Sequence, residues 1–139
     1  MYKRFSRLKR RDRDLKVYIS IGGWTFNDPE QPTRHVFSDL AASKTKQDAF
    51  FKSLKSFMSK HDFDGVDIDW EYPVQSERSG RKEDYENFPI LLARLKDYLE
   101  KHADSDGLTI AIPAPSSSLQ HYNLKAMVST PLSHDLHSC

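Results

Sequence analysis

The chain has 139 residues, of which 37% are hydrophobic and 29% are charged, a composition typical of a single globular domain. Its 21 Lys and Arg against 20 Asp and Glu give a net charge of +1, which argues against a polyanionic partner such as nucleic acid. No apolar run is long enough to span a membrane, and the only cysteine, Cys139, excludes an intrachain disulfide bond.

The N-terminal residues 2–12 are predicted to form a basic helix in which Tyr2, Phe5 and Leu8 recur on one side. Its basic face has two interpretations: binding of nucleic acid or anionic lipid, or the solvated surface of an outer helix of the fold. We favour the second, because no other basic patch accompanies this one. Residues 1–8 are basic but have no apolar stretch, so we expect no signal peptide here.

The next elements alternate between strand and helix. Residues 16–21 are predicted to form a buried parallel strand that runs into a loop at Gly22 and Gly23. Residues 28–35, which include two prolines, are predicted to form a loop. Residues 46–61 are predicted to form a helix whose apolar stripe packs in the core. That stripe consists of Ala49, Phe50, Leu54, Phe57 and Met58.

The acidic residues 64–71 are the next predicted strand, and residues 74–83 form a charged loop. A helix over about 82–102 follows, in which Pro89 lies near the start or causes a bend. Its apolar stripe consists of Tyr85, Phe88, Leu92, Leu95 and Leu99.

A third strand at residues 108–112 and a short helix at 119–127 complete the alternation. Strands that alternate with helices form a parallel sheet joined by crossovers. The predicted fold class is therefore α/β, and the polar motifs stand at the carboxyl ends of the strands.

The segment from Asp64 to Glu71 carries four carboxylates in eight residues, spaced D-x-x-D-x-D-x-E. Because side chains of a strand alternate, Asp67, Asp69 and Glu71 are predicted to share one face, with the apolar residues between them on the other. Like charges crowded in a poorly hydrated place raise at least one pKa, so one carboxyl is expected to keep its proton at neutral pH. Such a group suits general acid catalysis of glycoside cleavage.

Two other interpretations of this motif are a calcium site and a solvated acidic loop. Calcium loops alternate their acids with polar residues. The residues interleaved here are Val66, Ile68 and Trp70, which suit a buried strand. We therefore expect no metal at this motif.

The run D-G-V-D-I-D-W-E-Y-P over residues 64–73 resembles the catalytic signature of the family 18 glycoside hydrolases, the chitinases. Upstream, K-V-Y-I-S-I-G-G-W-T over residues 16–25 resembles the S-x-G-G strand of the same family. The intervening and following sequence resembles the large fungal chitinases in particular, at residues 27–29, 37–41 and 77–81. The resemblance covers roughly residues 5–127.

This resemblance implies endo-hydrolysis of β-1,4-linked N-acetylglucosamine polymers, without a cofactor. Glu71 would be the general acid that protonates the glycosidic oxygen. The nucleophile would be the acetamide oxygen of the substrate itself rather than a second carboxylate. Asp69 would hold the acetamide N–H and stabilise the oxazolinium ion, and Asp67 would share a proton with Asp69.

The resemblance also implies roles around this centre. Ser20, Gly22 and Gly23 would shape the adjacent strand end, where a bulky side chain would crowd Asp67. For the two glycines, a plain strand-to-loop turn is the alternative.

Three further residues receive roles from the resemblance. Asp64 would support the base of the strand, and Trp24 and Tyr72 would line the sugar site with their aromatic faces. The implied partners are chitin or N-acetylglucosamine oligosaccharides, with no nucleic acid and no membrane.

The fold that the resemblance implies is a partial (β/α)8 TIM barrel, about strands three to five with their helices. A complete barrel needs about 250 residues, so open sheet edges are expected, and these would favour self-association. Residues 1–127 would be the partial catalytic domain. Residues 128–139 would be a degenerate or irregular tail, with His134 where the family has a tyrosine.

Two alternatives to a chitinase remain. The chain could be a non-catalytic remnant that binds chitin oligosaccharides, or an inactive truncated gene product. The family is extracellular or attached to the cell wall, whereas this chain shows no export signal. We therefore expect either an incomplete copy of a longer protein or an intracellular one.

Overall fold

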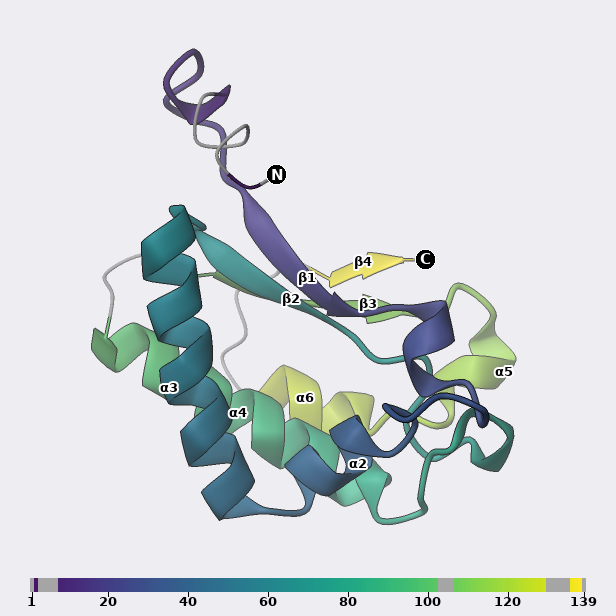
Figure 1. The fold of residues 1–139 in the computed structure, drawn as a ribbon. Coiled ribbons are helices and arrows are strands. Elements are labelled where there is room, and N and C mark those ends of the chain that lie inside the picture. Colours follow the sequence, from purple (N-terminus) through teal and green to yellow (C-terminus); the bar gives the residue numbers. More distant parts are fainter. Residues whose placement is uncertain (1, 3–7, 103–106, 130–135, 139) are drawn as a thin grey trace.

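The computed structural model describes residues 2, 8–102, 107–129 and 136–138 (Figure 1). In chain order its elements are strand β1 (Tyr18–Gly22), 3-10 helix η1 (Trp24–Asn27), helices α2 (Val36–Ala41) and α3 (Lys44–His61), strand β2 (Gly65–Asp69), 3-10 helix η2 (Ser76–Arg78), helix α4 (Asp84–His102), strand β3 (Gly107–Ile112), helices α5 (Ser116–Leu119) and α6 (Leu124–Ser129), and strand β4 (Leu136–Ser138).

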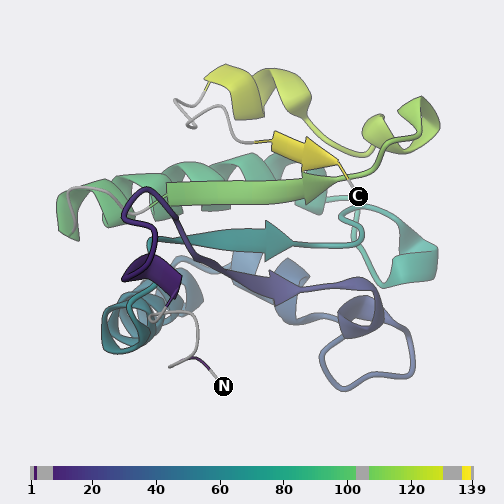
Figure 2. The ribbon, with the colours of Figure 1, turned by 90° about the horizontal axis from the view of Figure 1, so that it is seen from above.

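The strands of the described residues form one parallel sheet in the order β1-β2-β3-β4. Helices α2, α3, α4 and α6 lie on one face of the sheet (Figure 1), and Figure 2 looks onto the opposite face. This arrangement confirms the predicted α/β class and is that of a partial (β/α)8 barrel. No helix among the described residues has the length and apolarity needed to cross a bilayer.

The core between the sheet and the helices is formed by apolar residues that recur at every second position in the strand and at helical spacing in the helix. In β2, Val66 and Ile68 alternate with the acids and are almost completely buried, and in α4 Leu92 and Leu95 recur at helical spacing and are fully buried. Burial of each such side chain contributes about 1.5–3 kcal/mol relative to exposure. The core therefore fixes β2 against α4 and leaves the acidic positions of β2 on the other face.

Helix α3 confirms its predicted stripe except at Ala49: Leu54 and Met58 are buried, and Phe50 and Phe57 are partly buried against the same core. Ala49 is exposed. The buried residues are Gln47, Phe51, Leu54 and Met58. The Gln47 side-chain amide donates to the carbonyls of Leu40 at 3.1 Å and Ala41 at 2.9 Å, at the end of α2. Because Gln47 is polar, the apolar pattern alone does not identify it as part of the buried face.

Helix α4 confirms most of its predicted stripe. Phe88, Leu92, Leu95 and Leu99 are buried, whereas Tyr85 is exposed. Pro89 lies inside the helix, close to its start at Asp84.

Several elements differ from the prediction. Helices η1 and α2 were not predicted, and neither was η2, which lies inside the loop predicted at 74–83. The single helix expected at 119–127 is replaced by α5 and α6. Both new elements near β1 are short, and their few apolar residues carry no clear period. The loop predicted at 28–35 is confirmed as a series of turns and bends.

The two ends of the chain are described only in part. Of the predicted basic helix, residues 3–7 lie outside the described residues, residues 8 and 9 are helical, and the chain turns at residues 10 and 11. His134 also lies outside the described residues. Within the predicted tail, β4 pairs in parallel with β3.

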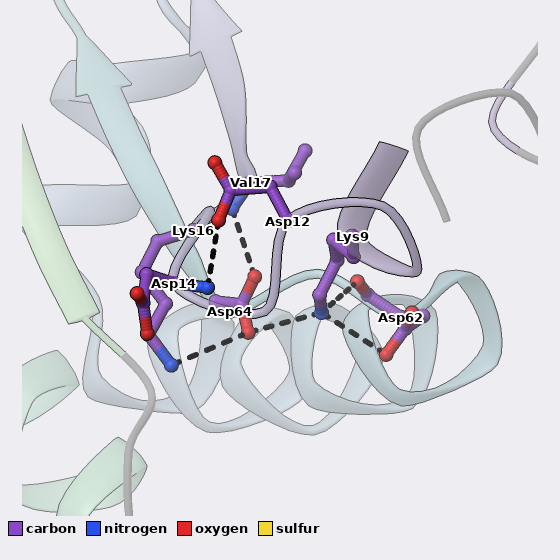
Figure 3. A network of polar contacts seen from close by, with 7 residues as sticks. All are labelled: Lys9, Asp12, Asp14, Lys16, Val17, Asp62 and Asp64. Carbon is purple, nitrogen blue, oxygen red and sulfur yellow. Dashed lines mark hydrogen bonds and ion pairs between the residues drawn. The ribbon is translucent and has the colours of Figure 1, made fainter. Parts of the chain in front are cut away.

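Asp64 ties the N-terminal segment to the start of β2 (Figure 3). Its carboxylate accepts hydrogen bonds from the Val17 N–H at 2.8 Å and from the Lys9 ammonium at 3.0 Å. Lys9 also donates to the carbonyl of Asp62 at 2.9 Å and to its carboxylate at 3.1 Å. These contacts place Asp64 at the base of the strand, at the end opposite to Glu71.

Candidate functional site

Asp67 is held between two hydroxyl groups from the neighbouring strands. The Ser20 hydroxyl of β1 donates to one carboxylate oxygen at 2.7 Å, and the Thr109 hydroxyl of β3 donates to the other at 2.8 Å. The sheet register places all three residues side by side. Asp67 is 7% exposed. Ser20, which the sequence places at the adjacent strand end, thus contacts Asp67 directly, and Thr109 contacts it from the other side.

Thr109 was not identified from the sequence, although it stands at an alternate position of a predicted strand. We expect Thr109→Val to destabilise the protein by about 1–3 kcal/mol, because it removes a hydrogen bond to a buried carboxylate without changing the shape of the side chain. The control is Thr45→Val on the exposed face of α3. Urea unfolding of both variants measures the effect, and equal losses would contradict it.

Gly22 and Gly23 join β1 to η1 and bring this segment against the end of β2. Gly22 has φ +122°, and a Cβ there would lie 2.0 Å from the Asp69 carbonyl oxygen. The Gly23 N–H donates to the same carbonyl at 2.9 Å. The crowding expected at Asp67 therefore falls on the backbone of Asp69, because the register pairs Gly22 with Asp69.

Glu71 lies two residues beyond the end of β2, so the predicted strand is too long. The ladder with β1 ends at the pair Gly22 and Asp69, and beyond it the chain leaves the sheet. Asp69 and Glu71 are both half-buried. Strand alternation therefore accounts for the face of Asp67 and Asp69, and the loop sets the direction of Glu71.

Trp70 anchors the backbone immediately before Glu71. Its ring is 1% exposed, stacks on Phe37 with centroids 5.4 Å apart and meets Phe88 edge-on at 5.0 Å. The Tyr122 hydroxyl donates to the Trp70 carbonyl at 3.2 Å. These contacts come from three other parts of the chain, so they hold the backbone at Trp70, directly before Glu71, from several sides.

Trp24 and Tyr72 form an aromatic pair at the same end of the sheet. Their ring centroids are 6.3 Å apart in an edge-to-face arrangement, and Trp24 is 55% exposed. Trp24 follows Gly23 directly, and Tyr72 follows Glu71 through a cis peptide bond. Two residues singled out separately in the sequence are therefore adjacent, next to Glu71.

Asp84 is a buried carboxyl beneath the loop that follows Glu71, and no sequence motif identifies it. One of its oxygens accepts hydrogen bonds from the Arg81 N–H at 2.6 Å, the Ser38 hydroxyl at 2.9 Å and the Val74 N–H at 3.4 Å. Burial raises the pKa of the Asp84 carboxyl, and these hydrogen bonds offset only part of that rise. Asp84 thus connects α2, the loop and the start of α4.

The raised pKa of Asp84 predicts a pH-dependent stability. The folded state holds this proton more tightly than the unfolded state, so the contribution of Asp84 is full below the ordinary pKa of 3.8 and falls as pH rises through the folded pKa. We expect the free energy of unfolding of the wild type, minus that of Asp84→Asn, to decrease as pH rises from about 3 to 7. Denaturant unfolding across this range measures the difference, and parallel curves would contradict the assignment.

The four carboxylates of the motif do not gather into one cluster. Asp64 stands before β2 and Glu71 after it, with the strand between them. Among the described residues, no group of three or more His, Cys, Asp and Glu side chains is arranged to hold a metal ion.

Comparisons with a family model and with known proteins indicate the same family. The sequence model of glycosyl hydrolases family 18 matches residues 1–131. Chitinase A1 of Niallia circulans is 38% identical over 119 residues, which are 81% of this chain and 16% of that protein. Probable chitinase 2 of Drosophila melanogaster is 38% identical over 101 residues, 73% of this chain and 19% of that protein.

Comparison of the fold with solved structures also identifies chitinases. The group IV chitinase of Ostrinia furnacalis, solved in complex with allosamidin, matches with a TM-score of 0.83 and 25% identity over 99% of this chain and 34% of that one. The chain thus spans between about a sixth and a third of the length of these proteins. Because they come from a bacterium and from insects, they do not single out the fungal type.

Proposed function

The chain belongs to family 18 of the glycosyl hydrolases, and on this premise we propose that it hydrolyses β-1,4-linked N-acetylglucosamine polymers at internal bonds, with Glu71 as the general acid. The observation that carries the proposal is the end of β2. There Asp67, a carboxylate held by two hydroxyls, stands in line with Asp69. An anchored loop presents Glu71 beside an aromatic pair of which Trp24 is exposed and Tyr72 half-buried.

In the proposed reaction the proton of Glu71 passes to the glycosidic oxygen as the bond to the anomeric carbon breaks. The acetamide oxygen of the same sugar forms the new bond to that carbon and yields an oxazolinium ion. Water then attacks the anomeric carbon, the bond from that carbon to the acetamide oxygen breaks, and a proton of the water passes to the Glu71 carboxylate. Asp69 holds the acetamide N–H and stabilises the cation, and Asp67 shares a proton with Asp69.

The aromatic pair supplies binding rather than chemistry. The faces of Trp24 and Tyr72 suit the apolar faces of pyranose rings, and Trp24 is exposed enough to accept one. The proposed ligands are chitin and its oligosaccharides. A fungal origin and an extracellular or cell-wall location stay predictions.

The substrate acetamide provides the test of this proposal. Purified protein is incubated with oligosaccharides of N-acetylglucosamine and with glucosamine oligosaccharides of the same length and linkage. We expect shorter products from the acetylated substrate and cleavage of the other slower by about 10²-fold or more, because the attacking oxygen is missing. Equal cleavage of both, or of neither, would contradict the proposal.

Binding without hydrolysis is a second candidate function. It is favoured by the exposed ring of Trp24, which can hold a sugar ring whether or not an acid acts beside it. Calorimetric binding of an N-acetylglucosamine oligosaccharide that is recovered uncleaved would support this candidate over the first.

A further inference from the structure

Arg78 is a buried arginine that the sequence did not single out. It closes the short helix η2, in the loop after Glu71, and is 9% exposed. A charged side chain this buried must be paired, because loss of water around an unpaired guanidinium is costly. Two of its hydrogen-bond partners, Glu71 and Trp24, belong to the candidate site.

The guanidinium makes three hydrogen bonds, to three different partners. Its Nε donates to the Glu71 carbonyl at 3.1 Å. One terminal nitrogen donates to the Trp24 carbonyl, and the other forms an ion pair with the Asp28 carboxylate. The planar fork of an arginine can hold such a set at fixed angles, whereas a lysine ammonium cannot.

The same guanidinium also covers the indole ring of Trp24. Its central carbon lies 3.9 Å from the ring centroid, well within the range of a cation–π contact. Trp24 is still 55% exposed, so the contact orders the ring without enclosing it. The hydrogen bond holds the Trp24 backbone, and the guanidinium on the ring face restricts rotation of the side chain.

We infer that Arg78 is a positioning residue that fixes the exposed indole of Trp24 relative to the backbone of Glu71. One side chain therefore couples the surface that would receive a sugar ring to the residue that would protonate the bond beside it. The catalytic part of this inference rests on the proposed function. The geometric part, order at Trp24, does not.

The first measurement needs no ligand. The chain has two tryptophans, and Trp70 is only 1% exposed, so acrylamide quenching of tryptophan fluorescence reports mainly on Trp24. Arg78→Ala and Arg78→Lys are expected to raise the quenching constant about twofold, because both uncover the ring. Arg81→Lys is the matched control: it lies in the same loop and pairs with Asp39 at the surface. Quenching of the Arg78 variants equal to that of the control would overturn the inference.

The second measurement uses an N-acetylglucosamine oligosaccharide, below the unfolding temperature of every variant. We expect Arg78→Lys to weaken binding about tenfold, through loss of the ordered ring. We expect its kcat to fall by up to about 10²-fold, through displacement of Glu71. Asp28→Asn removes the ion-pair partner of Arg78 and keeps the other contacts of the guanidinium. It should lower both the binding affinity and kcat, but by less than Arg78→Lys. A lysine variant with the binding and kcat of Arg81→Lys would overturn the role in catalysis.

The two arms separate this inference from the proposed function. Wild-type protein that neither binds nor cleaves the oligosaccharide would overturn the proposed function, while the quenching arm would still decide whether Arg78 orders Trp24. Normal wild-type activity together with unaffected Arg78 variants would overturn the inference and leave the proposed function standing.

Discussion

Glu71→Gln is expected to reduce the hydrolysis of an N-acetylglucosamine oligosaccharide by about 10²–10⁴-fold, because the amide cannot supply the proton that the leaving oxygen needs. Gln has nearly the shape of Glu, and the anchors of this position, at Trp70 and Arg78, act on the backbone. Binding of the oligosaccharide should therefore persist, and the free energy of unfolding should change by less than about 0.5 kcal/mol.

The matched control for this variant is Glu77→Gln. Glu77 lies in η2 of the same loop and is exposed. Steady-state rates, calorimetric binding and denaturant unfolding of the two variants give the comparison. Hydrolysis by Glu71→Gln at the rate of the Glu77→Gln protein would remove Glu71 from the role of acid.

Gly22→Ala is expected to cost about 3 kcal/mol or more of folding free energy and to leave much of the protein unfolded. Two effects add at this position: φ +122° is strained for any residue with a Cβ, and that Cβ would lie 2.0 Å from the Asp69 carbonyl oxygen. A backbone atom of a central strand cannot move aside without breaking the ladder that pairs β1 with β2.

Gly23→Ala is the matched control, because Gly23 also has a positive φ but an added Cβ there would meet no backbone atom at close range. Its φ is +99°, but the nearest atom to an added Cβ is a carboxylate oxygen of Asp69 at 3.7 Å, an ordinary contact. Its cost should be about 1–2 kcal/mol, from the backbone alone. Unfolding by urea followed by circular dichroism separates the two. A loss at Gly22 no larger than at Gly23 would contradict the close approach of β1 to Asp69.

The sequence predicted the parts of the fold that depend on local patterns. Val66 and Ile68 alternate with Asp67 and Asp69, and a strand with one apolar and one acidic face has few ways to pack. In α3 the same reasoning failed at Gln47, a polar residue whose amide is satisfied by the end of α2. A pattern of apolar residues cannot reveal a buried polar group with its own partners.

The sequence motifs predicted the central residues of the candidate site, but not the residues that hold them in place. Glu71, Trp24 and Tyr72 were named from two short motifs, and the structure brings them to one end of the sheet. Arg78 and Asp84 were missed because some of their partners lie far away in the chain: Arg78 reaches Trp24, 54 residues before it, and Asp84 reaches Ser38, 46 residues before it. Contacts between residues so far apart produce no local pattern that can be recognised in a single sequence.

The claim that Glu71 donates a proton to the leaving group is tested most directly by two synthetic chitobiosides that differ only in that group. One carries a phenol that needs protonation, and the other a strongly acidic phenol that leaves without it. We predict that Glu71→Gln loses about 10²-fold or more with the first substrate and far less with the second, while wild-type protein cleaves both. An equal loss with both substrates, or no cleavage of either by the wild type, would contradict the account.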